Sequence, residues 1–187
     1  MTAIARVLDF SRKASGALMS RWRNLYYRAL GVEIAGYAWL RRISIPRNHC
    51  MIYLANGVGL DEGVTLLASG HGDAKMIAIG ENTYINRNTF IDASEQIRIG
   101  RGVGIGPHCY ITDHDHGTEP GTPIMDQPLV SSPTTISDGV WLGAGCIVLK
   151  GVTIGKNTVV GAGSIVVRDL PADIIAEGRP ARAVRKR

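Results

Sequence analysis

Aromatic residues are scarce in this chain of 187 residues, where Phe, Trp and Tyr together make up 6%. The three cysteines, Cys50, Cys109 and Cys146, are odd in number and far apart, which argues against a disulfide scaffold and against a CxxC metal site. No apolar run approaches the roughly 18 residues of a membrane-spanning helix, and no secretory signal is evident. These absences favour a reducing compartment, and we expect the cytoplasm.

Cationic residues are concentrated at the two ends of the chain, whose formal net charge is +5. Residues 1–30 hold Arg6, Arg12, Lys13, Arg21, Arg23 and Arg28 against Asp9, and the tail holds Arg179, Arg182, Arg185, Lys186 and Arg187. Basic ends on a near-neutral body indicate anionic partners such as phosphates or lipid headgroups. No nucleic-acid partner is expected, because there is no recognised motif and no aromatic interleaving.

An aliphatic residue recurs at every sixth position from Ile136 to Val166, and the members are Ile136, Leu142, Val148, Ile154, Val160 and Val166. A second column of small or β-branched residues lies four places after the first five of them: Val140, Cys146, Val152, Thr158 and Ser164. A helix repeats near 3.6 residues and a simple strand near 2, so neither sustains this period. A period of six with a small second position predicts an all-β, hexapeptide β-helix.

The same period extends toward the N-terminus, through Leu54, Leu60 and Leu66, then Ile79, Ile85, Ile91 and Ile97, and after a shift to Ile99 through Ile105 and Ile111. The segment from Ser69 to Lys75 interrupts it as a loop. We therefore expect a β-helix over residues 32–170, with irregular first strands over 32–53. A helix over 1–31 and a basic tail over 171–187 would flank it.

Residues 2–30 are expected to form an amphipathic helix, with Gly31 placed to stop it. Its apolar residues follow three- and four-residue steps: Ile4, Leu8, Leu18, Trp22, Leu25 and Ala29. Two hypotheses are open for this helix. It caps the first rung of the β-helix, or it lies on an anionic membrane surface and makes the protein peripheral to the membrane. The two are compatible if each face of the helix serves one of them.

The interval from Ile111 to Ile136 is far longer than one rung, and the inserted loop 112–135 is polar and rich in Gly and Pro. It also contains the only close pair of histidines, His114 and His116. A long loop inside a compact domain is usually functional. We therefore expect the active site here.

The segments IGKNTVVGAGSIVVRDLP, VWLGAG and GRPAR resemble the hexapeptide-repeat acyltransferases, in the branch of the galactoside and maltose acetyltransferases and the polysaccharide O-acetyltransferases. The resemblance covers about residues 54–185. It implies a left-handed parallel β-helix with three rungs per coil, and a homotrimer with active sites between neighbouring subunits. It also implies acetyl-CoA as co-substrate. The repeats alone are less specific, since sugar nucleotidyltransferases and zinc carbonic anhydrases share them.

In that family a loop histidine is the general base that takes the proton of the acceptor hydroxyl. Counting from Pro107 without a gap places it at His116, with His114 as the alternative. Asp113 and Asp115 either orient a ring or form an acidic turn. Asn86, in a segment that resembles the family's Asn-x-Asn rung, is implied near the reacting centre, or it forms a side-chain ladder at a turn.

For CoA, the resemblance points to eight residues: Trp141, Gly143, Ala144, Gly161, Ala162, Arg168, Arg182 and Arg185. Small turn residues let backbone groups approach a pantetheine arm, and guanidinium groups bind phosphate in a fork. The glycines are equally explained by β-helix turns, and the arginines by a solvated tail. Ser94 stands where the sugar acetyltransferases have Asp, and their N-terminal acceptor-binding segment is not recognisable. The acceptor is therefore not carried over.

No metal site is expected. The carbonic anhydrase relatives need two of three histidines five residues apart, whereas His108 and His114 are six apart. His49 and His71 complete the set of histidines, and a His-x-His pair alone is a weak metal signal. The sequence thus predicts a CoA-dependent O-acetyltransferase acting on a sugar hydroxyl, of a cell-surface polysaccharide or its precursor. The alternatives are N-acetylation of an amino sugar, serine acetyl transfer, and a non-catalytic scaffold with basic membrane-binding ends.

Overall fold

The computed structural model describes the backbone of residues 3–70 and 74–187, and the side chains of these residues from Ser15 onward. The side chains of Ile4 and Leu8 in the predicted helix, of Arg6, Asp9, Arg12 and Lys13, and all of His71 lie outside this description.

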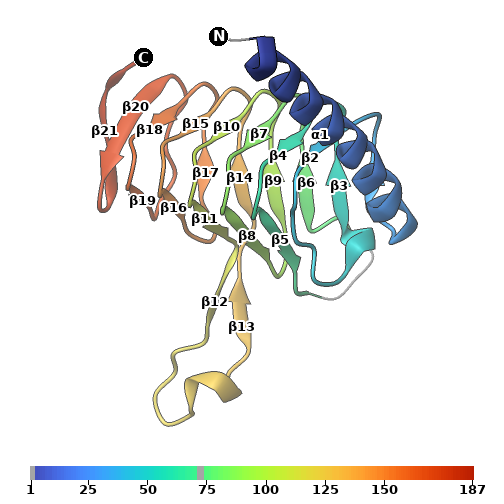
Figure 1. Cartoon of the computed structure of the whole chain (residues 1–187). Coiled ribbons are helices and arrows are strands. Elements are labelled where there is room, and N and C mark those ends of the chain that lie inside the picture. The colour runs from blue at the N-terminus through green and yellow to red at the C-terminus, as the bar shows by residue number, and fades with distance from the viewer. Residues whose placement is uncertain (1–2, 71–73) are drawn as a thin grey trace.

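The body is a triangular prism made of three parallel sheets, and the chain visits them in turn (Figure 1). The first sheet contains β1 (Glu33–Ile34), β3 (Ile52–Leu54), β6 (Ile77–Ile79), β9 (Ile97–Ile99), β14 (Thr134–Ile136) and β17 (Thr153–Ile154). The second contains β2 (Trp39–Leu40), β4 (Gly59–Leu60), β7 (Tyr84–Ile85), β10 (Gly104–Ile105), β15 (Trp141–Leu142), β18 (Val159–Val160), β20 (Ile174–Gly178) and β21 (Ala181–Lys186). The third contains β5 (Thr65–Ala68), β8 (Phe90–Ala93), β11 (Tyr110–Thr112), β16 (Ile147–Val148) and β19 (Ile165–Val166). This is the predicted left-handed β-helix.

Stacked aliphatic residues fill the prism from end to end. Each coil places the repeating residue directly above its counterpart, as in the pairing of Ile105 with Ile85 and with Leu142. The repeating residues from Leu54 to Val166 are fully or almost fully buried. Burying such a side chain contributes roughly 1.5–3 kcal/mol. The shift in period at Ile99 is absorbed because β9 is three residues long and buries Ile97 and Ile99 together.

Helix α1 (Ala3–Ala29) lies against the first coil and ends where Gly31 adopts a φ of 106°. The predicted stop at this glycine is therefore confirmed. The face turned to the prism carries two buried polar residues, Ser20 and Asn24, which bind the backbone of β2 and its neighbour Ala38. Tyr27 lies on the same face and packs on the core. Among the described residues, α1 included, no helix is long and apolar enough to cross a bilayer.

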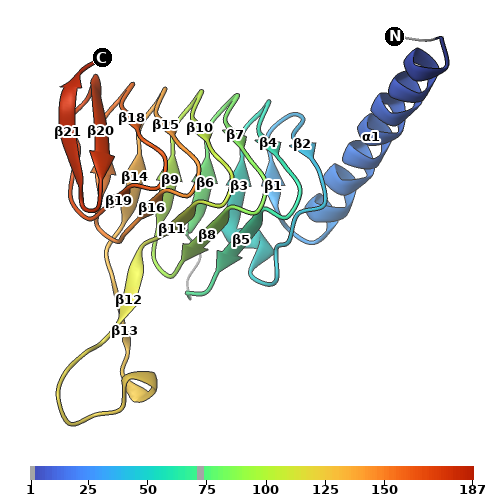
Figure 2. The ribbon, with the colours of Figure 1, turned by 60° about the vertical axis from the view of Figure 1, so that its left-hand side comes forward.

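Two antiparallel pairings interrupt the parallel stack. Strand β21 folds back on β20 at the C-terminal end of the second sheet. Strands β12 (His114–His116) and β13 (Leu129–Ser131) form a hairpin that projects from the prism (Figure 2). Two short 3₁₀ helices, η1 (His49–Met51) and η2 (Ile124–Asp126), lie in the connections. The division of the chain into three segments at residues 31 and 170 stays a prediction, and β20 continues the second sheet beyond residue 170.

Candidate active site

The inserted segment is organised by the hairpin of β12 and β13, in which His114 pairs with Ser131 and His116 with Leu129. Successive residues of a strand point to opposite faces, so His114 and His116 share one face and Asp115 lies on the other. Beyond the strands, the Gln127 side chain bridges the loop: its Oε1 accepts the N–H of Glu119 at 2.8 Å, and its Nε2 donates to the carbonyl of Thr122 at 2.8 Å.

The Asp113 carboxylate anchors the base of the hairpin. The residue is 0% exposed, and its oxygens accept the backbone N–H groups of Ser94, Glu95 and Gln96 at 2.8, 2.8 and 2.6 Å. The same carboxylate lies 3.0 Å from Nδ1 of His114. Asp113 therefore does both of the things expected of it: it holds a turn and it orients the His114 ring. Because a carboxylate only accepts, the proton of a neutral His114 belongs on Nδ1.

The two histidines differ in their surroundings. The His114 side chain is 13% exposed and is held by Asp113 and by the Thr112 hydroxyl at 3.3 Å. His116 is exposed and lines a hollow of about 620 Å³. The other lining residues are Asp115, Gly117, Thr118, Glu119, Gln127, Pro128, Val130 and Lys150. His116 is thus the imidazole that opens onto the hollow, and His114 is the one that neighbouring side chains hold in place.

Lys150, which the sequence reasoning did not single out, fastens the hairpin to the prism. It follows β16, and its Nζ donates to the Val130 carbonyl at 3.0 Å and lies 3.4 Å from the Asp115 carboxylate. Together with Ser94, Asp113, Ser132 and Arg168, it defines what we call the hairpin corner, where the third sheet turns into the first. Arg168, a predicted phosphate ligand, lies here after β19 and is exposed.

Asn86 lies at a different corner, where the second sheet turns into the third. The turns stacked there, which we call the glycine corner, are residues 86–87, 106–107, 143–144 and 161–162, and each is joined to the next coil by a backbone hydrogen bond of 2.8–2.9 Å. The structure thus brings Asn86 into line with the predicted CoA residues Gly143, Ala144, Gly161 and Ala162. Its own Oδ1 accepts the N–H of Arg87 at 2.8 Å, as in a turn.

Close stacking requires small residues at the glycine corner. A Cβ on Gly143 would lie 2.5 Å from the backbone nitrogen of Ala162, and one on Gly106 would lie 2.6 Å from that of Ala144. Both values are below any normal contact. The glycines are therefore needed for the fold itself, whatever lies against the outside of the turns.

The remaining predicted CoA residues border this corner on the second sheet. Trp141 is 57% exposed on β15, and β21 carries Arg182 and Arg185, which are both exposed. An exposed indole, small turns and two guanidinium groups at one end of a sheet fit a ligand with an apolar arm and phosphates. Within one chain the His116 hairpin lies at the hairpin corner, across the third sheet from Asn86.

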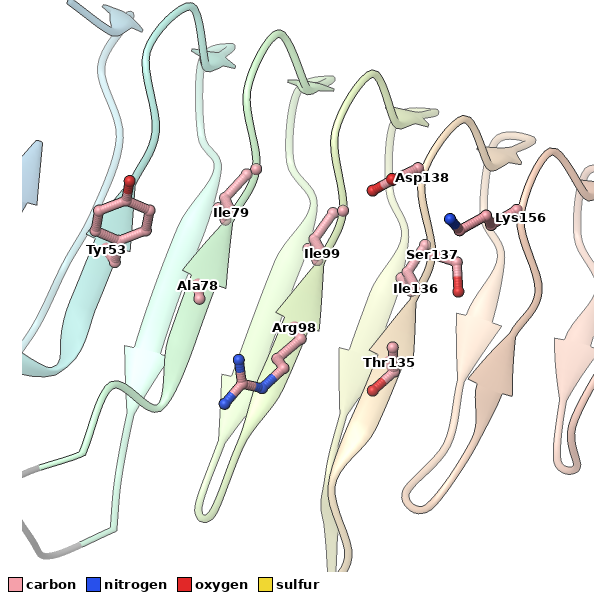
Figure 3. A pocket seen from close by; sticks show the side chains of 12 residues that line it. Tyr53, Ala78, Ile79, Arg98, Ile99, Thr135, Ile136, Ser137, Asp138 and Lys156 are labelled. Carbon is pink, nitrogen blue, oxygen red and sulfur yellow. The ribbon is translucent and has the colours of Figure 1, made fainter. Parts of the chain in front are cut away.

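A further hollow of about 300 Å³ lies on the outer face of the first sheet. Figure 3 shows Tyr53 and Arg98 projecting from neighbouring strands on either side of the small Ala78. None of the predicted catalytic or cofactor residues lines it. Within the part of the chain that the structure describes, no three His, Cys, Asp or Glu side chains gather as metal ligands would.

The chain was compared with known proteins. The family described as "Bacterial transferase hexapeptide (six repeats)" matches residues 133–168. Nodulation protein L of Rhizobium meliloti is 36% identical over 155 residues, covering 80% of this chain and 84% of that protein. A putative lipopolysaccharide biosynthesis O-acetyl transferase, WbbJ of Escherichia coli K12, is 35% identical and covers 66% of each. Galactoside O-acetyltransferase of the same strain is 37% identical, covering 59% of this chain. This chain spans about half of that relative's length, 54%.

The chain is also similar to solved structures of acyltransferases. The hexapeptide-repeat acetyltransferase VCA0836 of Vibrio cholerae superposes with a TM-score of 0.63 at 31% identity, covering 71% of this chain and 72% of that one, and it has also been solved with acetyl coenzyme A. AntD, an N-acyltransferase of Bacillus cereus solved with coenzyme A, gives a TM-score of 0.71 at 23% identity over 86% of this chain and 87% of its own, a likeness of fold alone. With its six-residue period, three-sheeted prism and this extent of identity to nodulation protein L, the chain belongs to the hexapeptide-repeat acyltransferase family.

Proposed function

We propose that this chain is an acetyl-CoA-dependent O-acetyltransferase that acts on a sugar hydroxyl, of a cell-surface polysaccharide or its precursor. The observation that carries the proposal is His116, an exposed imidazole beside a hollow, on a hairpin whose base is locked by a buried carboxylate. The names of the relatives, two of them O-acetyl transferases of sugars or lipopolysaccharide, support the same reaction.

His116 acts as the general base. It accepts the proton of the acceptor hydroxyl while that oxygen bonds to the acetyl carbonyl carbon, and the carbon–sulfur bond then breaks. The thiolate that leaves takes up a proton and departs as free CoA. His114, held by Asp113 and Thr112, is a positioning residue that fixes the strand from which His116 projects. Direct transfer is expected, because among the described residues no Ser or Cys lines the hollow beside His116.

Acetyl-CoA supplies the acetyl group as a thioester, and the glycine corner is where we place it. Trp141 offers an exposed apolar surface for the pantetheine arm, and Gly143, Ala144, Gly161 and Ala162 let it lie close to the backbone. Arg182 and Arg185 carry the charge that phosphates need, and Arg168 lies at the hairpin corner, where it would face the ligand of a neighbouring site.

The site requires more than one copy of the chain. Asn86 and His116 lie at opposite corners of the third sheet, so a homotrimer that sets the hairpin corner of one subunit against the glycine corner of the next would unite them. In that arrangement the Asn86 side-chain amide or a backbone N–H stabilises the developing oxyanion.

The central test is a set of histidine variants assayed by release of free thiol from acetyl-CoA over a panel of sugar acceptors. Replacement of His116 by Ala should lower kcat at least ~100-fold with an unchanged circular dichroism spectrum. His114→Ala should have the smaller effect, and His49→Gln, in the connection before β3 and outside the hairpin, serves as the matched control. Full activity of the His116 variant would reject the mechanism.

The shared site has its own test. Inactive Asn86→Ala and His116→Ala chains, co-expressed with different tags and isolated as mixed oligomers, should recover activity if each site draws one residue from each chain. Mixed oligomers that stay inactive would contradict the shared site while leaving the role of His116 open to the first assay.

Two other functions remain to be compared. N-acyl transfer to an amino sugar uses the same general base, since an amine acceptor also loses a proton. Amino sugars, and serine for the serine acetyltransferase alternative, therefore belong in the acceptor panel. A scaffold without catalysis is distinguished by acetyl-CoA itself. Saturating acetyl-CoA should raise the Tm of an enzyme that binds it with micromolar affinity, whereas it should leave the Tm of a scaffold unchanged.

A further inference from the structure

Helix α1 turns its apolar face away from the protein. The residues packed on the prism are Ser20, Asn24 and Tyr27, which are 1%, 2% and 7% exposed. On the opposite side Leu18, Trp22, Leu25 and Tyr26 are 58%, 64%, 60% and 58% exposed, and we call these four residues the outer row. At 3.6 residues per turn they form one continuous stripe.

The polar face is fully used by the fold. The Ser20 hydroxyl accepts the N–H of Leu40 at 2.9 Å, and Asn24 donates to the carbonyl of Ala38 at 2.6 Å and accepts its N–H at 3.1 Å. These contacts fix the rotation of the helix about its axis. The outer row therefore cannot turn inward to be buried without breaking them.

We propose that the outer row binds the surface of an anionic lipid bilayer, with the helix lying in the plane of the interface. The evidence for this partner is charge. Residues 1–30 carry six Arg or Lys side chains against one Asp, and Arg21 is exposed beside Trp22. A second copy would bring the same positive charge to the contact, whereas anionic headgroups bring the opposite one.

The composition and position of the row suit an interface. Trp and Tyr are the side chains that settle at the boundary between headgroups and acyl chains. Figure 2 shows α1 leaning out from the prism toward its N-terminal end, at the opposite end of the body from β21. The hairpin projects from a different part of the prism, so this binding does not depend on the proposed transferase reaction.

The test is flotation of the full-length protein with vesicles. Phosphatidylcholine vesicles containing phosphatidylglycerol are compared with phosphatidylcholine alone, for the wild type and for the variant Leu18→Ser/Trp22→Ser/Leu25→Ser. Val184→Ser is the control, because Val184 is 57% exposed on β21 at the other end of the prism. Oligomeric mass and thermal unfolding of each variant are measured without lipid.

The wild type and the control should float with the anionic vesicles, and the binding should fall as salt is raised from about 0.1 M to 1 M, where the Debye length shrinks from ~10 to ~3 Å. The triple variant should bind at least ~10-fold more weakly, with its Tm and oligomeric mass unchanged. Equal binding by the triple variant, or absence of wild-type binding, overturns the proposal. A fall in oligomeric mass in the triple variant also overturns it and assigns the row to a contact between copies of the chain.

Discussion

Nδ1 of His114 lies 3.0 Å from Oδ1 of Asp113, and the same carboxylate receives three backbone N–H groups from the turn at residues 94–96. One buried side chain thus ties the start of the hairpin to the coil beneath it. The position of β12, and with it that of His116, depends on this residue.

Replacement of Asp113 by Asn should destabilise the protein strongly. The new amide NH₂ would face donors that now bind a charged oxygen, and the loss should be roughly 3 kcal/mol in the free energy of unfolding, measured with urea. Asp115→Asn is the matched control, since its side chain is 54% exposed beside Lys150, and it should cost less than ~1 kcal/mol. Equal effects of the two changes would refute the anchoring role of Asp113.

Alanine at Gly143 should be more harmful than alanine at Gly145. At Gly143 the added methyl meets the Ala162 backbone at 2.5 Å, and neither coil can yield without opening the stack. We expect a loss of roughly 2–3 kcal/mol. At Gly145 no atom of the described residues lies within 4 Å of the new methyl, but φ is 66°. That conformation alone costs about 1 kcal/mol for a residue with a Cβ. Thermal unfolding of both variants shows which of them loses more stability.

Asp61 should make the stability of the first coils depend on pH. Burial alone would raise its pKa, but the N–H of Glu62, the Tyr84 hydroxyl at 2.8 Å, and Arg87 and Arg41 outweigh burial, and the pKa lies below its ordinary 3.8. A lowered pKa means that the stabilisation is present above the unfolded-state value and is lost as pH falls through the folded-state value.

The measurement is urea unfolding of Asp61→Asn and the wild type at pH 7 and pH 3. The gap in unfolding free energy between wild type and variant should be larger at pH 7. It should narrow at pH 3, which lies below the ordinary value of 3.8, because the unfolded wild-type chain then takes up a proton that the folded-state carboxylate, with its lowered pKa, resists. Glu81→Gln, at an exposed position, is the control for the loss of one charge. A gap of the same size at both pH values would contradict the assignment.

Cys50 should be the thiol that reagents reach in the native protein. Cys50 is exposed, while Cys109 and Cys146 are buried in neighbouring coils. The neighbouring Cys109 lowers the pKa of Cys146 through a hydrogen bond, yet Cys146 is buried and stays out of reach of a bulky disulfide reagent. Ellman's reagent should titrate Cys50 alone in buffer and all three thiols in urea. Any fast-reacting thiol in a Cys50→Ser variant would show that the stack opens.

The fold was predictable because its six-residue repeat can be recognised within a short stretch of the sequence. Every sixth residue from Ile136 to Val166 reports the same environment, and the structure buries them all. The family resemblance added the handedness, which no residue pattern supplies. The side of α1 that faces the prism was not predictable. Amphipathicity indicates two faces, and here the hydrogen bonds of Ser20 and Asn24, together with the burial of Tyr27, place the more polar face against the prism.

The sequence could place the candidate site on the inserted loop, but it could not predict the hairpin or the contacts that hold it. Residues 112–135 show no alternation that predicts β12 and β13, because a projecting hairpin has no buried face to fill. The partners of Asp113 lie at residues 94–96, one coil earlier, and Lys150 reaches Val130 from one coil later. Such contacts depend on how the coils stack around the insertion, and no residue spacing in the sequence predicts that stacking.

The reversed direction of β21 has a consequence for how these molecules behave in concentrated solution. The last coil of a parallel stack has unpaired strand edges, which can pair with the end coil of a second molecule. Repeated pairing of this kind would give a fibre. Here the last strand of the second sheet runs antiparallel to its neighbour, so it offers the wrong polarity for a new coil. Its exposed residues include Arg182, Arg185 and Lys186, which repel an identical end. Strand β21 therefore hinders end-to-end joining of two β-helices through the second sheet.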